Sequence, residues 1–61
     1  MSTADELKKL LRIWAILWNV SPQTAMIRVQ MALKIDTFTN NEAAQKLAVT
    51  YLRHKLEEKD E

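Results

Sequence analysis

Few side chains in this sequence have the chemistry of a catalyst. His54 is the one histidine, and it stands between the cations Arg53 and Lys55. No cysteine, aspartate or glutamate is placed to form a nucleophile–histidine–acid relay with it. Glu57 and Glu58 are adjacent carboxylates, but they lie close to the last residue, where we expect no apolar pocket to turn one into a general acid. We therefore predict that the chain is not an enzyme.

The composition also argues against bound cofactors and metals. The 61 residues include no cysteine, no glycine and a single histidine. Disulfides and thiolate metal sites are excluded, and one histidine cannot form a histidine-rich site within one chain. Glycine-rich phosphate loops are excluded as well. We expect no cofactor and no metal ion.

The small net charge of +1 hides an uneven distribution along the chain. Residues 57–61 sum to −3, which leaves +4 for residues 1–56. An excess of this size is small for a nucleic-acid-binding domain. We expect residues 1–56 to form a single helical domain and residues 57–61 to form an acidic, frayed C-terminal tail.

No segment has the features of a membrane span or a signal peptide. The longest unbroken apolar run, Ile13–Trp18, has six residues, whereas a transmembrane helix needs about twenty. Asp5 and Glu6 stand where a signal peptide carries positive charge. Lys8 and Arg12 could belong to a helix lying on a membrane surface, but the apolar stripe of that helix would then face lipid instead of a protein core. We expect a cytoplasmic protein without membrane contact.

Helix-start signals occur three times, at an even spacing. Thr3 and Thr39 each begin a capping box, with a glutamate three residues later. Ser21 is a candidate N-cap, and Pro22 follows at the first helical position, where its missing N–H costs nothing. The predicted fold is therefore all-α, with helices near 4–18, 22–35 and 40–57.

The segment 27–35 also supports a different structure. Large apolar residues occupy every odd position, which is the spacing of a β-strand. A lone strand would need a partner from another chain, as in a two-stranded β-ribbon across a dimer. Pro22 and helix-forming residues such as Ala25 and Met26 favour a helix. We predict the helix, with a helix–strand–helix chain and an intermolecular β-ribbon as the alternative.

Each predicted helix carries more apolar residues than one small core needs. The predicted core stripes are Leu7, Leu10, Leu11, Trp14, Leu17 and Trp18 in the first helix, Ala25, Met26, Val29, Ala32 and Leu33 in the second, and Ala44, Leu47, Ala48 and Tyr51 in the third. The apolar face of the third helix is extended by Leu52, Val49 and Leu56. The residues predicted to be buried by self-association are Ile13, Ile16, Val20, Ile27, Met31, Ile35, Val49 and Leu56. Burying one such side chain contributes about 1.5–3 kcal/mol, so leaving several exposed forfeits much of a small domain's stability.

This apolar surplus, together with the absence of catalytic patterns, predicts a class of function. We expect a small interaction or regulatory protein that forms a homo-oligomer, most simply a two-fold dimer and helical bundle. Its partner is expected to be another protein, recognised by helix packing in a groove.

The alternative is a small dimeric transcriptional regulator that binds nucleic acid. Its phosphate contacts would come from basic residues of the second and third helices, namely Arg28, Lys34, Lys46, Arg53 and Lys55. The segment 42–50 resembles the first half of a helix-turn-helix. Ala48 stands where the turn usually has glycine, and Leu52 continues the helical period, so we predict one continuous helix.

Overall fold

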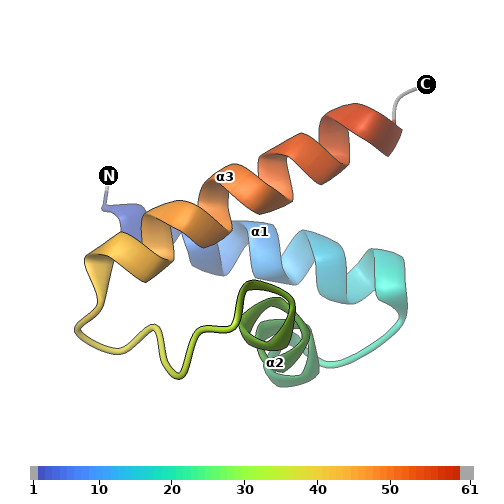
Figure 1. Cartoon of the computed structure of the whole chain (residues 1–61). Coiled ribbons are helices and arrows are strands. Elements are labelled where there is room, and N and C mark those ends of the chain that lie inside the picture. Colours follow the sequence, from blue (N-terminus) through green and yellow to red (C-terminus); the bar gives the residue numbers. More distant parts are fainter. Residues whose placement is uncertain (1, 60–61) are drawn as a thin grey trace.

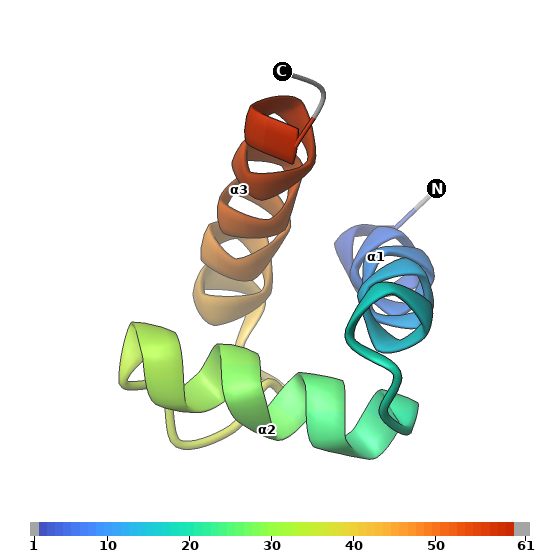
Figure 2. The same cartoon turned by 90° about the vertical axis from the view of Figure 1, so that its right-hand side faces the viewer.

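The structure, a computed structural model, describes residues 2–59, and this part of the chain forms three α-helices. They are α1 (Thr3–Trp18), α2 (Pro22–Leu33) and α3 (Glu42–Lys59). α1 and α3 run in the same direction, and α2 crosses below both of them (Figures 1 and 2). α1 packs against both other helices, whereas α2 and α3 contact each other little. The predicted all-α class is confirmed.

α1 begins at Thr3 because Ser2, and not Thr3 as predicted, is its N-cap. Ser2 has an extended backbone, and its hydroxyl accepts a hydrogen bond from the Asp5 N–H at 3.1 Å. Ser2 and Thr3 both carry the hydroxyl that an N-cap needs. The cap is Ser2, one residue before the position that the capping-box spacing indicated. The helix ends at Trp18, because Asn19 adopts the left-handed conformation (φ 58°) that closes its last turn.

α2 begins at the predicted signal. The Ser21 hydroxyl accepts a hydrogen bond from the Thr24 N–H at 3.2 Å, and Pro22 is the first helical residue. The helix ends at Leu33, short of the predicted residue 35, because Lys34 adopts the left-handed conformation (φ 57°) that closes it.

The alternating segment is helical over residues 27–33, as the preferred prediction had it. On a helix, residues at every second position point in different directions, and their burial differs accordingly. Val29 is completely buried, whereas Ile27 and Met31 are exposed. The alternation therefore reflects two apolar sides of α2 rather than a strand.

α3 begins at Glu42 because Asn41, and not Thr39 as predicted, supplies the cap. Asn41 Oδ1 accepts a hydrogen bond from the Ala44 N–H at 3.2 Å. The Gln45 amide reaches back and donates to the Phe38 carbonyl at 2.6 Å. Phe38 itself is buried in the core, so this contact helps to fix where the loop ends and the helix starts.

α3 then continues without a break to Lys59, which confirms the prediction of one continuous helix across residues 48–52. Residues 57–59 of the predicted frayed tail are helical, whereas Asp60 and Glu61 lie outside the described residues.

The core lies where α1 meets the other helices. Its buried residues are Leu7, Leu10, Leu11, Trp14, Ala15, Ala25, Val29, Phe38, Ala44, Ala48, Val49 and Leu52. Three residues of the predicted core stripes, Leu17, Ala32 and Leu47, are exposed instead. On α3 the buried row runs through Ala48 and Leu52, and Leu47 lies about 100° around the helix from Ala48. Leu47 therefore faces away from α1.

This arrangement predicts opposite outcomes for two leucines of the same helix. Leu52 has no exposed area, whereas Leu47 is 51% exposed. We expect Leu52→Ala to lower the free energy of unfolding by about 2–5 kcal/mol, and Leu47→Ala to lower it by less than about 1 kcal/mol. Chemical denaturation of both variants at low protein concentration measures this difference. Equal losses would contradict the placement of the core.

The cap assignment makes a second prediction. Replacing the capping side chain in Asn41→Ala should cost about 0.5–2 kcal/mol, because the Ala44 N–H loses its acceptor. Thr39→Ala serves as the matched control, since Thr39 lies in the loop before the helix, and should cost much less. A larger loss in Thr39→Ala, measured by thermal unfolding, would restore Thr39 as the cap.

Candidate interaction surfaces

Trp14 lies at the point where the helices meet. Its side chain is 3% exposed, and its indole Nε1 donates a hydrogen bond to the Leu52 carbonyl of α3 at 3.4 Å. The Trp14 and Trp18 rings are 5.0 Å apart between centroids and tilted by 39°, within the range of favourable aromatic pairs. The prediction that Trp14 packs in the core is confirmed, and Trp18 is partly buried beside it.

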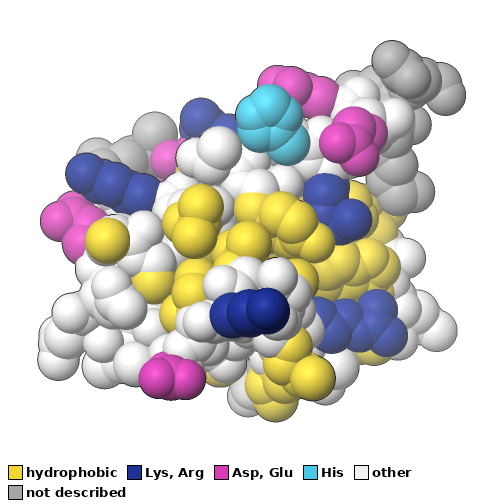
Figure 3. All heavy atoms as spheres, in the orientation of Figure 1, with side chains coloured by type: hydrophobic (Ala, Val, Ile, Leu, Met, Phe, Trp, Pro, Cys, Tyr) yellow, Lys and Arg dark blue, Asp and Glu magenta, His cyan; other side chains and the backbone are white. Residues whose placement is uncertain are grey.

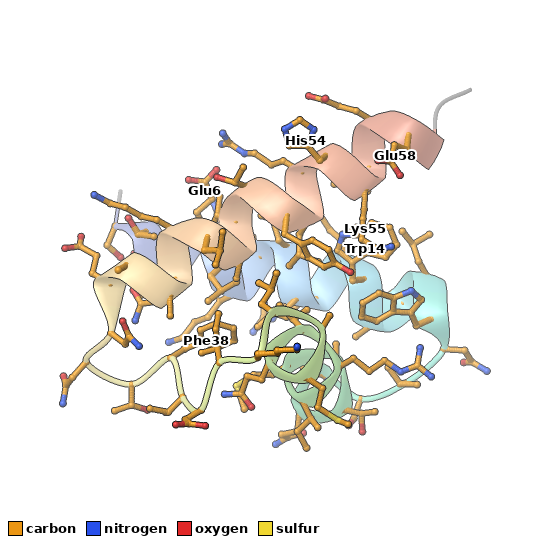
Figure 4. The ribbon with its side chains drawn as sticks, in the orientation of Figure 1. Glu6, Trp14, Phe38, His54, Lys55 and Glu58 are labelled. Atoms are coloured by element: carbon orange, nitrogen blue, oxygen red, sulfur yellow. The ribbon has the colours of Figure 1, made fainter. Side chains whose placement is uncertain are left out.

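Two cations cover these aromatic rings. The Arg28 guanidinium carbon lies 5.3 Å from the centroid of the Trp18 ring. Lys55 Nζ lies 5.9 Å from the centroid of Trp14 and 5.5 Å from that of Tyr51. Figure 4 shows Lys55 of α3 beside Trp14 of α1. Because the five side chains come from all three helices, these contacts tie the helices together on one side of the molecule.

Large apolar side chains are exposed on every helix. Among the described residues, those with 42–79% exposure are Ile13, Ile16, Leu17, Ile27, Met31 and Leu47. The three on α1 are neighbours at i, i+3 and i+4, and the two on α2 are neighbours at i and i+4. Figure 3 shows hydrophobic side chains gathered on one face across α2 and α3, with Lys and Arg side chains around them.

The predicted self-association residues divide into three groups. Ile13, Ile16, Ile27 and Met31 are exposed. Val20, Ile35 and Leu56 are partly buried and pack against the core. Val49 lies in the core itself, so it does not belong to the exposed surface. The sequence missed Leu17 and Leu47 as surface residues, because a helical wheel does not show how much of a broad apolar face a neighbouring helix covers.

The five predicted nucleic-acid contacts do not form one surface. On α3, Lys46 and Arg53 lie on the same side of the helix, but about 160–180° around it from Lys55. Arg53 forms an ion pair with Glu6 of α1, and Arg28 covers the Trp18 ring. Lys34 is the C-cap residue of α2. The structure therefore places two of these cations on α2 and separates Lys46 and Arg53 from Lys55 on α3.

Several open hollows lie along α1. One of about 370 Å³ lies between the starts of α1 and α3 and is lined mainly by polar residues, including Ser2, Asn40 and Asn41. Another, of about 340 Å³, lies between α1 and α2, with Leu11 and Met26 in its lining.

Residues 2–59 contain no group of three His, Asp or Glu side chains close enough together to hold a metal ion. None of the helices in this part of the chain is long and apolar enough to cross a bilayer.

Comparisons with family models, with curated proteins and with solved structures find no match for this chain.

The cation–aromatic contacts predict a measurable contribution to stability. Arg28→Ala should lower the free energy of unfolding by about 0.5–1 kcal/mol, because Trp18 loses the cation above its ring. Lys46→Ala removes a cation from the exposed side of α3 and should change stability by less than about 0.5 kcal/mol. Urea denaturation compares the two, and an equal effect would show that the Arg28 contact is not stabilising.

Proposed function

We propose that the protein is a small, non-enzymatic interaction protein that associates with itself through exposed apolar helix faces and docks on another protein. The observation that carries this proposal is the exposure of Ile16 and Met31, at 79% and 74%. Each would contribute about 1.5–3 kcal/mol if buried. A 61-residue chain has a typical stability of only about 3–9 kcal/mol, so apolar surface of this kind is best explained by a partner that covers it.

The exposed residues lie on more than one side of the molecule. Leu11 of α1 lines the hollow between α1 and α2, and Ile16 lies about 140° around α1 from it. The apolar surface of α1 therefore faces away from α2, which has its own exposed residues, Ile27 and Met31. Two separate surfaces allow the protein to hold a second copy and a different protein at the same time. We also propose that the protein acts in the cytoplasm.

Recognition in this proposal needs no chemical step. The cation–aromatic contacts and the shared core hold the three helices as a platform. Side chains at i, i+3 and i+4, such as Ile13, Ile16 and Leu17, are spaced to enter the groove of a partner.

The nucleic-acid alternative has less support, because Lys46 and Arg53 lie on the other side of α3 from Lys55 and Arg53 pairs with Glu6. Binding to duplex DNA at low salt that weakens steeply as salt rises would favour this alternative. An apolar docking surface lacks that salt dependence.

Sedimentation equilibrium of the intact chain tests the proposal. We expect a dimer or larger oligomer that dissociates on dilution, because burial of apolar area against a second copy favours association. Ile13→Ser/Ile16→Ser and Ile27→Ser/Met31→Ser variants then identify the surface involved by a weaker association. A protein that stays monomeric up to about millimolar concentration (a dissociation free energy below about 4 kcal/mol) would contradict self-association.

A further inference from the structure

Two of the hollows along α1 join into one groove. The hollow of about 340 Å³ between α1 and α2 shares Lys8, Leu11 and Met26 with a hollow of about 200 Å³ that reaches the loop before α3. The two linings together define the α1–α2 groove. It lies on the side of α1 that faces α2, so it is separate from the exposed surface around Ile16.

The floor of the α1–α2 groove is apolar and held in place by the core. Leu7, Leu11 and Phe38 line it and are only 4–7% exposed. Met26 lines both hollows and is partly buried against the same core. A floor fixed by core packing accepts a partner side chain with little reorganisation, and the unbranched Met26 side chain adapts to the shape of what it covers.

One edge of the α1–α2 groove is basic. Among the described residues that line it, the charged ones are Lys8 and Arg12, which lie one turn apart on α1. Both are exposed, and neither forms an ion pair with another described residue. The first turn of α2 contains no acid. Asp36 is in the same loop as Phe38, but it lines neither hollow.

Asp5 is the acid that borders this edge. It lies one turn before Lys8 and lines a neighbouring hollow together with Lys8, Lys9 and Arg12. With Asp5 included, this border of α1 has three cations and one acid, a net charge of +2. The edge therefore attracts a carboxylate even though one acid of the chain lies beside it.

From the apolar floor and the basic edge we infer that the α1–α2 groove binds an acidic, amphipathic segment of another protein. A large apolar side chain of that segment covers Leu11 and Met26, and a carboxylate next to it lies beside Lys8 or Arg12. An open groove fits a protein segment better than a small molecule, because small-molecule sites enclose most of their ligand. This inference rests on the docking part of the proposed function and names its site and the chemistry of the partner.

A second copy of the chain matches this groove poorly. Each of the three helices contains more Lys and Arg residues than Asp and Glu residues. None of them is therefore an acidic segment that complements the basic edge. The outer apolar surfaces of α1 and α2 stay available for self-association.

Selection of random peptides from a display library on the intact chain tests the inference. We expect the enriched peptides to carry Asp or Glu within about one helical turn of a large apolar residue. One such peptide, labelled with a fluorophore, then gives dissociation constants by fluorescence anisotropy. We expect Lys8→Glu/Arg12→Glu to weaken its binding by about tenfold or more at low salt. Lys34→Glu/Lys46→Glu makes the same change in net charge outside the groove and should change the constant by less than about threefold.

A further variant tests the apolar floor. Met26→Gln keeps the length of the side chain and should weaken peptide binding by about fivefold, because less apolar area is buried. Circular dichroism checks that each variant is folded. If Lys8→Glu/Arg12→Glu loses its helical signal, Lys8→Gln/Arg12→Gln replaces it, and we again expect weaker binding.

The outcomes separate this inference from the proposed function. A selection that enriches no peptide, or equal weakening by the two charge-reversal variants, would overturn the inference. Weakening by Ile13→Ser/Ile16→Ser instead would place the partner on the other side of α1, overturn the inference and leave the proposed docking standing. Binding to phosphatidylglycerol vesicles in place of any peptide would overturn it in favour of an anionic lipid surface. Sedimentation equilibrium tests self-association independently of all these results.

Discussion

The burial of Trp14 is the contact on which the rest of the structure depends. This one indole is almost completely enclosed, donates its N–H to the Leu52 carbonyl of α3, and packs against Trp18. Trp18 in turn lies under Arg28 of α2. Because α2 and α3 contact each other little, α1 and its aromatic pair provide the main connection between the other two helices.

A fold centred on one shared helix buries only the inner side of each helix. Among residues 2–59 the three helices are the only regular elements, and none of them covers the outer sides of the others. The large apolar residues that remain there, from Ile16 on α1 to Met31 on α2, are the structural basis of the proposed interactions.

The sequence was most informative where the signal was local. Ser21-Pro22 fixed the start of α2, since an N-cap and a first-turn proline need no tertiary contact. The caps at Ser2 and Asn41 were missed because neighbouring residues had equally suitable side chains. Whether Leu47, Val49 or the cations of α3 face solvent depends on the side from which α1 approaches α3, and helical periodicity does not contain that information. The apolar surplus itself was visible in the sequence.

Methyl NMR spectra of the intact chain, recorded at a series of protein concentrations, test self-association directly. Three of its four isoleucines are exposed, namely Ile13 and Ile16 on α1 and Ile27 on α2. If copies of the chain associate through these apolar helix faces, the methyl signals of Ile13 and Ile16, or those of Ile27 and Met31, shift as concentration rises. Signals from all four residues that are independent of concentration would contradict self-association.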